Sequence, residues 1–165
     1  MKKVLKTIVI ILILSTMIFP VSAFAEKGAA ADAFSKYLDN EGTIYTYKGK
    51  TDNGEDIFLI SFGGDNTDVT VNFFFDNDDT GAVLYVWNLY EIKPSQADEC
   101  IKVCNDLNSR YRFVKFYYDE SDCTVTVQSD VIFRADDIGE LCNEIVHRTA
   151  FLSDEGYLVL QEALG

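Results

Sequence analysis

The sequence predicts an α+β protein, in which an antiparallel sheet carries its helices mainly on one face. Three observations indicate this class. A short helical segment comes first, and four segments rich in β-branched and aromatic residues follow it. A second helix then precedes a hairpin, and a strongly amphipathic helical segment closes the chain. The expected order is α-β-β-β-β-α-β-β-α, within a single domain over residues 26–165.

Residues 1–25 have the layout of a secretory signal peptide. The basic stretch MKKVLK precedes an apolar run of 15 residues, TIVIILILSTMIFPV. Ala23 and Ala25 then occupy the small-residue positions of a cleavage site, so the mature chain is expected to start at Glu26. The protein is therefore expected to be secreted or held in the cell envelope, with no stable membrane insertion after cleavage. The alternative is a signal retained as a membrane anchor.

The first half of the predicted domain is one helix and four strands. Ala30, Phe34 and Leu38 recur at helical spacing and predict a helix over residues 29–40. The strands are expected at residues 43–49, 55–62, 67–75 and 82–89. These four strands are separated by TDNG, GGDN and DNDDTG, clusters of residues that tolerate tight turns.

The DNDDTG stretch at residues 76–81 has the composition of a calcium-binding loop. Asp76, Asp78, Thr80 and Gly81 fit the early positions of an EF-hand loop. Trp87 stands where the bidentate glutamate is required, and the flanks are strands rather than helices. The stretch is therefore interpreted as the turn of a hairpin.

The second half of the domain is expected to be a helix, a hairpin and a helical end. Pro94 suits the first turn of a helix over residues 94–108. The hairpin strands are expected at residues 112–118 and 123–131. An amphipathic helix is expected over residues 136–152, with Asp136 and Asp137 in its first turn, where negative charge is favourable. A separate last helix is expected over residues 154–164.

The charge of the chain limits its partners. There are 14 lysine and arginine residues against 27 acidic ones, for a formal net charge of −13. Such a surface repels phosphate backbones, so nucleic acid is excluded as a partner, while a basic protein is favoured.

Four cysteines in an exported chain raise the question of disulfides. Cys100 and Cys104 lie one helical turn apart and are not expected to bridge each other. A bridge from either to Cys123 or Cys142, or a role for all four as small core residues, remains open. The spacing does not match a zinc site, and His147 is the only histidine, so no metal or other cofactor is expected.

No catalytic residues are predicted. The sequence contains no nucleophile elbow, dinucleotide-binding or phosphate-binding glycine motif, or zinc-protease motif. A single histidine removes most schemes that pair it with serine or cysteine. With 27 acidic residues, a pair of catalytic carboxylates stays open as an alternative.

Alternation along the strands separates two faces of the sheet. One face is an apolar core: Phe58, Ile60, Phe62, Val69, Val71, Phe73, Leu84, Val86, Val114, Phe116, Val125 and Val127. The other face mixes polar residues with five large aromatic ones: Phe74, Tyr85, Trp87, Phe113 and Tyr117. These five form the candidate partner-binding surface, because exposed aromatic patches mark interaction sites. Alternatively, the segment YLVLQEAL or the first helix could cover this face.

The run CNDLNSRYRFVKFYYDESDCTVTVQSDV, at residues 104–131, resembles the YbjN family of proposed bacterial sensory transduction regulators. A helix there ends in an Asn-x-x-Asn turn, here Asn105 and Asn108, before an aromatic strand, an acidic turn and a return strand. The resemblance covers roughly residues 32–164. It implies a fold similar to type III secretion chaperones, often dimeric, and it implies no catalytic residues. Two features depart from the family: a possible extra strand at TIYTYKG and the export signal.

Together these observations predict an exported, non-enzymatic protein of YbjN type, chaperone-like or regulatory. It is expected to bind a protein partner, or a second copy of itself as a homodimer, through its sheet and helix faces. The alternatives are a small secreted hydrolase based on carboxylates and a module that binds a small ligand between sheet and helices.

Overall fold

A computed structural model describes residues 26–134 and 137–165. The predicted signal peptide, residues 1–25, lies outside the described residues, as does Asp136 at the predicted start of the last long helix. The described elements follow the predicted order. They are α1 (Ala29–Glu41), β1 (Thr46–Lys50), β2 (Asp56–Phe62), β3 (Val69–Phe75), β4 (Gly81–Glu91), a short 3₁₀ turn (Pro94–Gln96), α2 (Ala97–Arg110), β5 (Val114–Asp119), β6 (Thr124–Ile132) and α3 (Ile138–Leu164).

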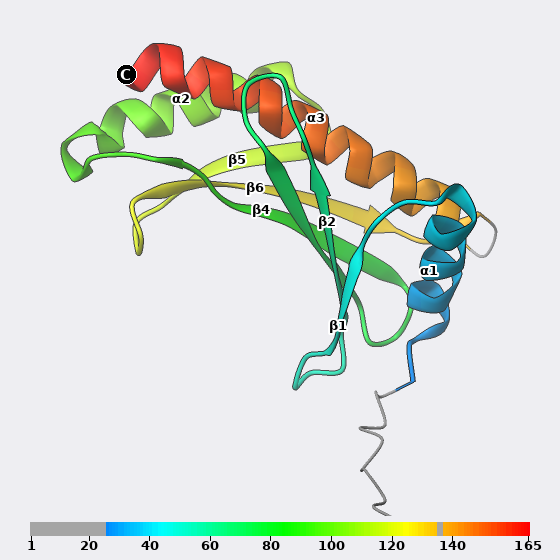
Figure 1. Ribbon diagram of the computed structural model, residues 1–165. Coiled ribbons are helices and arrows are strands. Elements are labelled where there is room, and N and C mark those ends of the chain that lie inside the picture. Colours follow the sequence, from blue (N-terminus) through cyan, green and yellow to red (C-terminus); the bar gives the residue numbers. More distant parts are fainter. Residues whose placement is uncertain (1–25, 135–136) are drawn as a thin grey trace, which may run out of the picture.

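The described strands form one six-stranded sheet in the order β1-β2-β3-β4-β6-β5, and all neighbours are antiparallel. In Figure 1, α2 and α3 lie together above the β4, β5 and β6 end of the sheet, and α1 lies at the other end of α3. The described helices therefore cover one face of the sheet, as the sequence predicts.

The core lies between this face and the helices. Phe34 of α1 is fully buried and contacts the rings of Phe58, Phe73 and Phe75, with centroids 5.6, 5.0 and 5.5 Å away. The residues assigned to the core face by alternation are buried, except Phe62 at the end of β2, which is half-buried. Strand periodicity therefore identifies the correct face for the core.

The two helices expected at residues 136–152 and 154–164 are one continuous helix, and the prediction of a break was wrong. The sequence Asp154-Glu155-Gly156 is typical of a turn, but here Gly156 packs against the core. A Cβ on Gly156 would lie 2.3 Å from Cε1 of Phe116. The glycine therefore permits α3 to approach the sheet closely, and it does not end the helix.

The remaining sequence predictions differ from the structure in detail. The strand expected at residues 43–49 begins later, at Thr46, and the strand expected at residues 112–118 begins at Val114. The DNDDTG stretch forms the turn between β3 and β4, where the amide of Asp76 donates to the carbonyl of Gly81 at 3.0 Å. Among the described residues no cysteine is disulfide-bonded: Cys100, Cys104 and Cys142 are buried, and Cys123 is half-buried.

Within the part of the chain that the structure describes, none of the helices combines the length and the hydropathy needed to cross a membrane.

Candidate functional site

The face of the sheet opposite the helices carries a cluster of aromatic side chains, here called the aromatic face: Phe74, Tyr85, Trp87 and Tyr117. Phe74 comes from β3, Tyr85 and Trp87 from β4, and Tyr117 from the outer strand β5. Alternation along each strand places them opposite the buried residues Phe73, Val86 and Phe116. The four residues therefore share one surface although they lie far apart in the sequence.

Three of these rings are in mutual contact. The ring of Phe74 lies 6.0 Å from that of Tyr85 and 5.7 Å from that of Trp87, and the rings of Tyr85 and Trp87 stack at 5.8 Å. The register of β4 with β6 shifts between Val86 and Tyr90, and Asn88 there has a left-handed φ of 52°. This bulge follows Trp87 directly, and bulges commonly redirect side chains at functional sites.

Tyr117 extends the cluster toward the edge of the sheet. Burial raises the pKa of its hydroxyl, with smaller contributions from the nearby Tyr85 and Asp119. Trp87 is 49% exposed and Tyr117 is 36% exposed. Side chains of this size at such exposure leave substantial apolar area in water, which a partner could bury.

Phe113 does not lie with the other four residues. It precedes the first residue of β5, and its left-handed φ of 67° interrupts the alternation on which its assignment depended. Its ring is 69% exposed and lies beneath the guanidinium of Arg148 of α3, 5.8 Å from the ring centroid. Phe113 is therefore a separate feature near α3.

Neither segment that could have covered the aromatic face does so. The last part of α3 packs on the core side, where Leu160 and Leu164 are buried and Gly156 meets Phe116. Helix α1 packs on the same side through Phe34. Among the described residues, no helix covers the aromatic face.

The outer edge of β5 is blocked by a side chain. The amide of Asn108, near the end of α2, donates to the carbonyl of Phe116 at 2.9 Å and accepts from the Phe116 amide at 2.7 Å. It thus occupies both backbone groups as a neighbouring strand would. Natural sheets block exposed edges to prevent unwanted strand pairing. In the sequence, Asn108 belongs to the Asn-x-x-Asn pattern of the family, and nothing in that pattern predicts this contact.

The other edge strand, β1, is short and irregular. It has five residues, its register with β2 shifts between Tyr47 and Gly49, and Gly49 has a φ of 95°. Lys48 adds a positive charge along it. These features also oppose the addition of a strand, so binding of a partner strand at either edge of the sheet is disfavoured.

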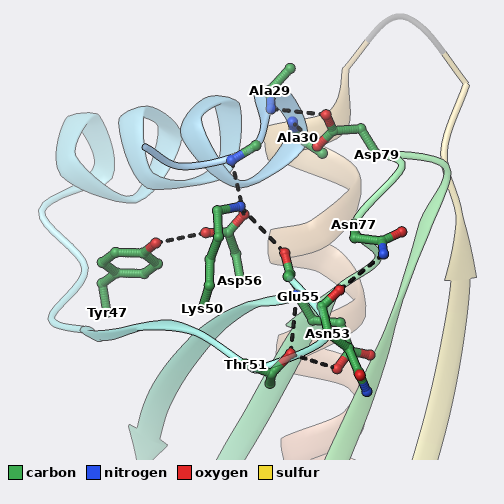
Figure 2. A network of polar contacts seen from close by, with 12 residues as sticks. Ala29, Ala30, Tyr47, Lys50, Thr51, Asn53, Glu55, Asp56, Asn77 and Asp79 are labelled. Carbon is green, nitrogen blue, oxygen red and sulfur yellow. Dashed lines mark hydrogen bonds and ion pairs between the residues drawn. The ribbon is translucent and has the colours of Figure 1, made fainter. Parts of the chain in front are cut away.

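A polar network fixes the start of α1 to the sheet (Figure 2). Asp79 of the β3–β4 turn accepts hydrogen bonds from the amides of Ala29 and Ala30 at 3.1 and 2.9 Å. A carboxylate at this position satisfies free helical amides and interacts favourably with the helix dipole. The acidic turn DNDDTG therefore has a structural role that its sequence did not indicate.

Asp56 lies beside this contact and is buried. Its carboxylate accepts from the Tyr47 hydroxyl at 2.6 Å, the Lys50 ammonium at 2.7 Å and the Gly28 amide at 2.8 Å. Burial alone would raise the pKa of Asp56, but these hydrogen bonds together lower it. A carboxylate held ionised by three donors is suited to structure rather than to proton transfer.

The remaining acidic cluster lines a shallow opening of about 210 Å³ beside the β3–β4 turn, with polar side chains only. Burial, and the charges of Asp78 and Glu55, raise the pKa of Asp76. Hydrogen bonds from Thr80 lower that of Asp78. The opening offers no apolar wall to hold a substrate. In the described ranges, no three histidine, cysteine or acidic side chains are placed to hold a metal ion.

The described residues form an α+β fold with an aromatic face opposite its helices, and the comparisons identify the family. The model of the YbjN family, described as "Putative bacterial sensory transduction regulator", matches residues 30–145, and the chain belongs to this family. The family is thus described by regulation and not by a reaction.

Two solved structures resemble this fold. One is YbjN from E. coli, described as "a putative transcription regulator", with a TM-score of 0.56 and 14% identity over 79% of this chain and 90% of that chain. The other is an uncharacterized protein from Methanothermobacter thermautotrophicus, with a TM-score of 0.56 and 16% identity over 82% of this chain and 99% of that chain. At this identity they show the fold alone. Comparison with curated proteins finds no match.

Proposed function

We propose that this chain is an exported, non-enzymatic YbjN-family module that binds a basic protein partner on its aromatic face. The observation that carries the proposal is the contact of Phe74, Tyr85 and Trp87 on a sheet face that no described helix covers. Aromatic side chains supply much of the binding free energy at protein interfaces. The family description, a regulator, is consistent with a binding role.

The net charge of the chain favours a different, basic protein as the partner over a second copy of the chain. The net charge of −13 makes two copies repel each other and attracts a basic protein. The aromatic face contains one close pair of opposite charges, Lys115 and Asp130, whose charged atoms lie 3.7 Å apart. Both side chains are largely exposed and form the rim of the surface. Exposed rim charges influence the orientation of a bound partner more than its affinity. A homodimer is therefore one outcome of the test and not the proposal.

The blocked sheet edges support face docking. Asn108 occupies the edge of β5, and β1 is short and bulged. A partner that added a strand would have to displace these features, whereas the aromatic face requires no rearrangement. A chaperone-like role, in which the face holds an apolar segment of another protein, is the mechanism that this geometry best supports.

Replacing Tyr85 and Trp87 together by serine is expected to weaken partner binding by about 30-fold, because two central aromatic side chains are lost. Proteins from the envelope fraction would be captured on wild-type and variant protein. A captured partner would then be purified, and its affinity measured by calorimetry. In the wild type, the emission of Trp87, the only tryptophan, should shift to shorter wavelength on binding.

The control is Ile101→Ser, which removes an exposed apolar side chain from α2, on the helix side of the molecule. It should leave capture unchanged. Equal capture by the double variant would overturn the proposal. Sedimentation of the free protein tests whether a second copy of the chain binds the aromatic face. A dimer that is present in the wild type and lost in the double variant would identify that second copy as the occupant.

Export is tested separately. The basic start, the apolar run and the Ala23 and Ala25 pattern support cleavage after Ala25. Terminal sequencing of protein recovered from the envelope or the medium should therefore begin at Glu26. Recovery of the intact chain from the cell interior would refute export while leaving the binding proposal in place.

A further inference from the structure

The helix side of the molecule contains a cavity that the proposed function does not use. It lies between α3 and the turn that joins β2 to β3, and it has a volume of about 220 Å³. Phe62, His147 and Phe151 provide aromatic surfaces, and Val69 and Ala150 provide apolar ones. The rings of Phe62 and His147 meet edge to face at 4.9 Å, and Phe151 is 63% exposed. The opening is thus mostly apolar and accessible.

Two carboxylates line the same cavity, Asp65 and Asp154. Asp154 is only 7% exposed, although it lies on a helix that faces solvent along one side. Its oxygens accept the backbone amides of Asp65, Asn66 and Thr67, at 3.2, 2.9 and 2.8 Å. No lysine or arginine is among the described residues that line the cavity. The buried carboxylate is therefore satisfied by these three amides and, at 3.1 Å, by the side-chain amide of Asn66, and the one basic side chain among the described lining residues is that of His147.

We propose that this cavity binds a small organic cation, an ammonium or guanidinium group carried on an apolar body. The aromatic faces of Phe62 and Phe151 would attract the cation and pack against its apolar body. Asp65, which is exposed, and Asp154, which is buried, would supply the opposite charge. An anion would meet two carboxylates, and a neutral ligand would gain nothing from their negative charge. The volume of about 220 Å³ lies below the usual range of ligand sites and suits one small amine of about ten heavy atoms.

The turn that lines the cavity packs closely against α3. A Cβ on Gly64 would lie 2.3 Å from both Oδ1 of Asp154 and the carbonyl oxygen of Thr67. The turn can therefore approach α3 this closely only with glycine at this position. Burial raises the pKa of Asp154, but the three backbone amides together lower it, so the carboxylate is ionised at neutral pH.

The test uses phenethylamine, with phenethyl alcohol as its neutral isostere and phenylpropanoate as the anion. Heteronuclear NMR of the purified protein at pH 8 would follow the amides of residues 62–65 and 147–154. Phenethylamine should shift them saturably and bind at least tenfold more tightly than the alcohol, and phenylpropanoate should not bind. Equal binding of amine and alcohol, or the absence of saturable shifts with the amine, would overturn the proposal.

Matched variants locate the site. Phe151→Ala and Asp65→Asn should each weaken binding of phenethylamine at least fivefold. Leu158→Ala removes another partly exposed apolar residue from α3, outside the cavity, and should change nothing. Unchanged binding in both cavity variants would refute the assignment.

A blocked arginine amide distinguishes the source of the cation. Tighter binding of this compound than of phenethylamine would support a side chain of another protein as the natural occupant, and the reverse would support a free amine. The cavity lies on the helix side of the molecule, so a failure of the cation proposal would not affect the proposal for the aromatic face. The variant with Tyr85 and Trp87 replaced should bind phenethylamine like the wild type.

Discussion

Phe34→Ala is expected to lower the free energy of unfolding by about 4 kcal/mol, the largest single effect that we predict. Phe34 is fully buried and is the contact through which α1 reaches the sheet, against the rings of Phe58, Phe73 and Phe75. Truncation removes the buried ring and leaves a cavity bounded by rigid aromatic neighbours, which can close only in part.

Urea unfolding followed through the emission of Trp87 measures the effect. Phe151→Ala is the matched control, because it deletes the same side chain from a site that is largely exposed and should change stability by no more than about 0.5 kcal/mol. A loss of less than about 1 kcal/mol in Phe34→Ala would show that α1 is not docked on the core as the structure has it.

The fold was largely predictable because its signals are local. Period-two alternation in β2, β3 and β6 identifies the core face without any knowledge of the partners of each strand. The spacing of Ala30, Phe34 and Leu38 likewise identifies the buried side of α1, and these three residues are fully buried. The continuity of α3 was not predictable, because it depends on the contact of Gly156 with Phe116, which lies far away in the sequence.

The aromatic face was predictable only in part. Phe74, Tyr85, Trp87 and Tyr117 stand within regular strands, where alternation determines the face of each side chain. Phe113 precedes β5 by one residue and has a left-handed φ, so the alternation of side chains along a strand does not apply to it. Whether a helix covers the face depends on where α1 and α3 dock, and their amphipathic patterns do not specify which sheet face they meet.

Three polar side chains with structural roles were missed for a common reason. Asp79, Asn108 and Asp154 each bind backbone groups of another element, and a backbone group has no sequence signature. The contacts of Asp79 with α1 span 49 and 50 residues, and those of Asp154 span 87 to 89.

Asp154→Ala is expected to lower the free energy of unfolding by about 3 kcal/mol at neutral pH. The carboxylate accepts three backbone amides of the β2–β3 turn and, at 3.1 Å, the side-chain amide of Asn66. Its removal leaves these donors without their protein partner. Asp154→Asn keeps one acceptor oxygen and should lose roughly half as much.

The pH dependence of this loss gives a further check. The pKa of Asp154 is lowered from its ordinary value of 3.8, because the amide hydrogen bonds outweigh burial. A carboxyl with a lowered pKa contributes its full stabilisation above the unfolded value and loses it as the pH falls through the folded one. The difference between wild type and Asp154→Ala should therefore be constant near neutral pH and shrink progressively below about pH 4.

Thermal and urea unfolding at several pH values would measure this difference. Asp32→Ala is the control, since Asp32 forms an exposed ion pair with Lys36 and should contribute less than about 0.5 kcal/mol. A difference that stayed constant down to pH 2 would mean that the charge of Asp154 is irrelevant to the turn, and it would also remove the buried anion on which the proposed cation site depends.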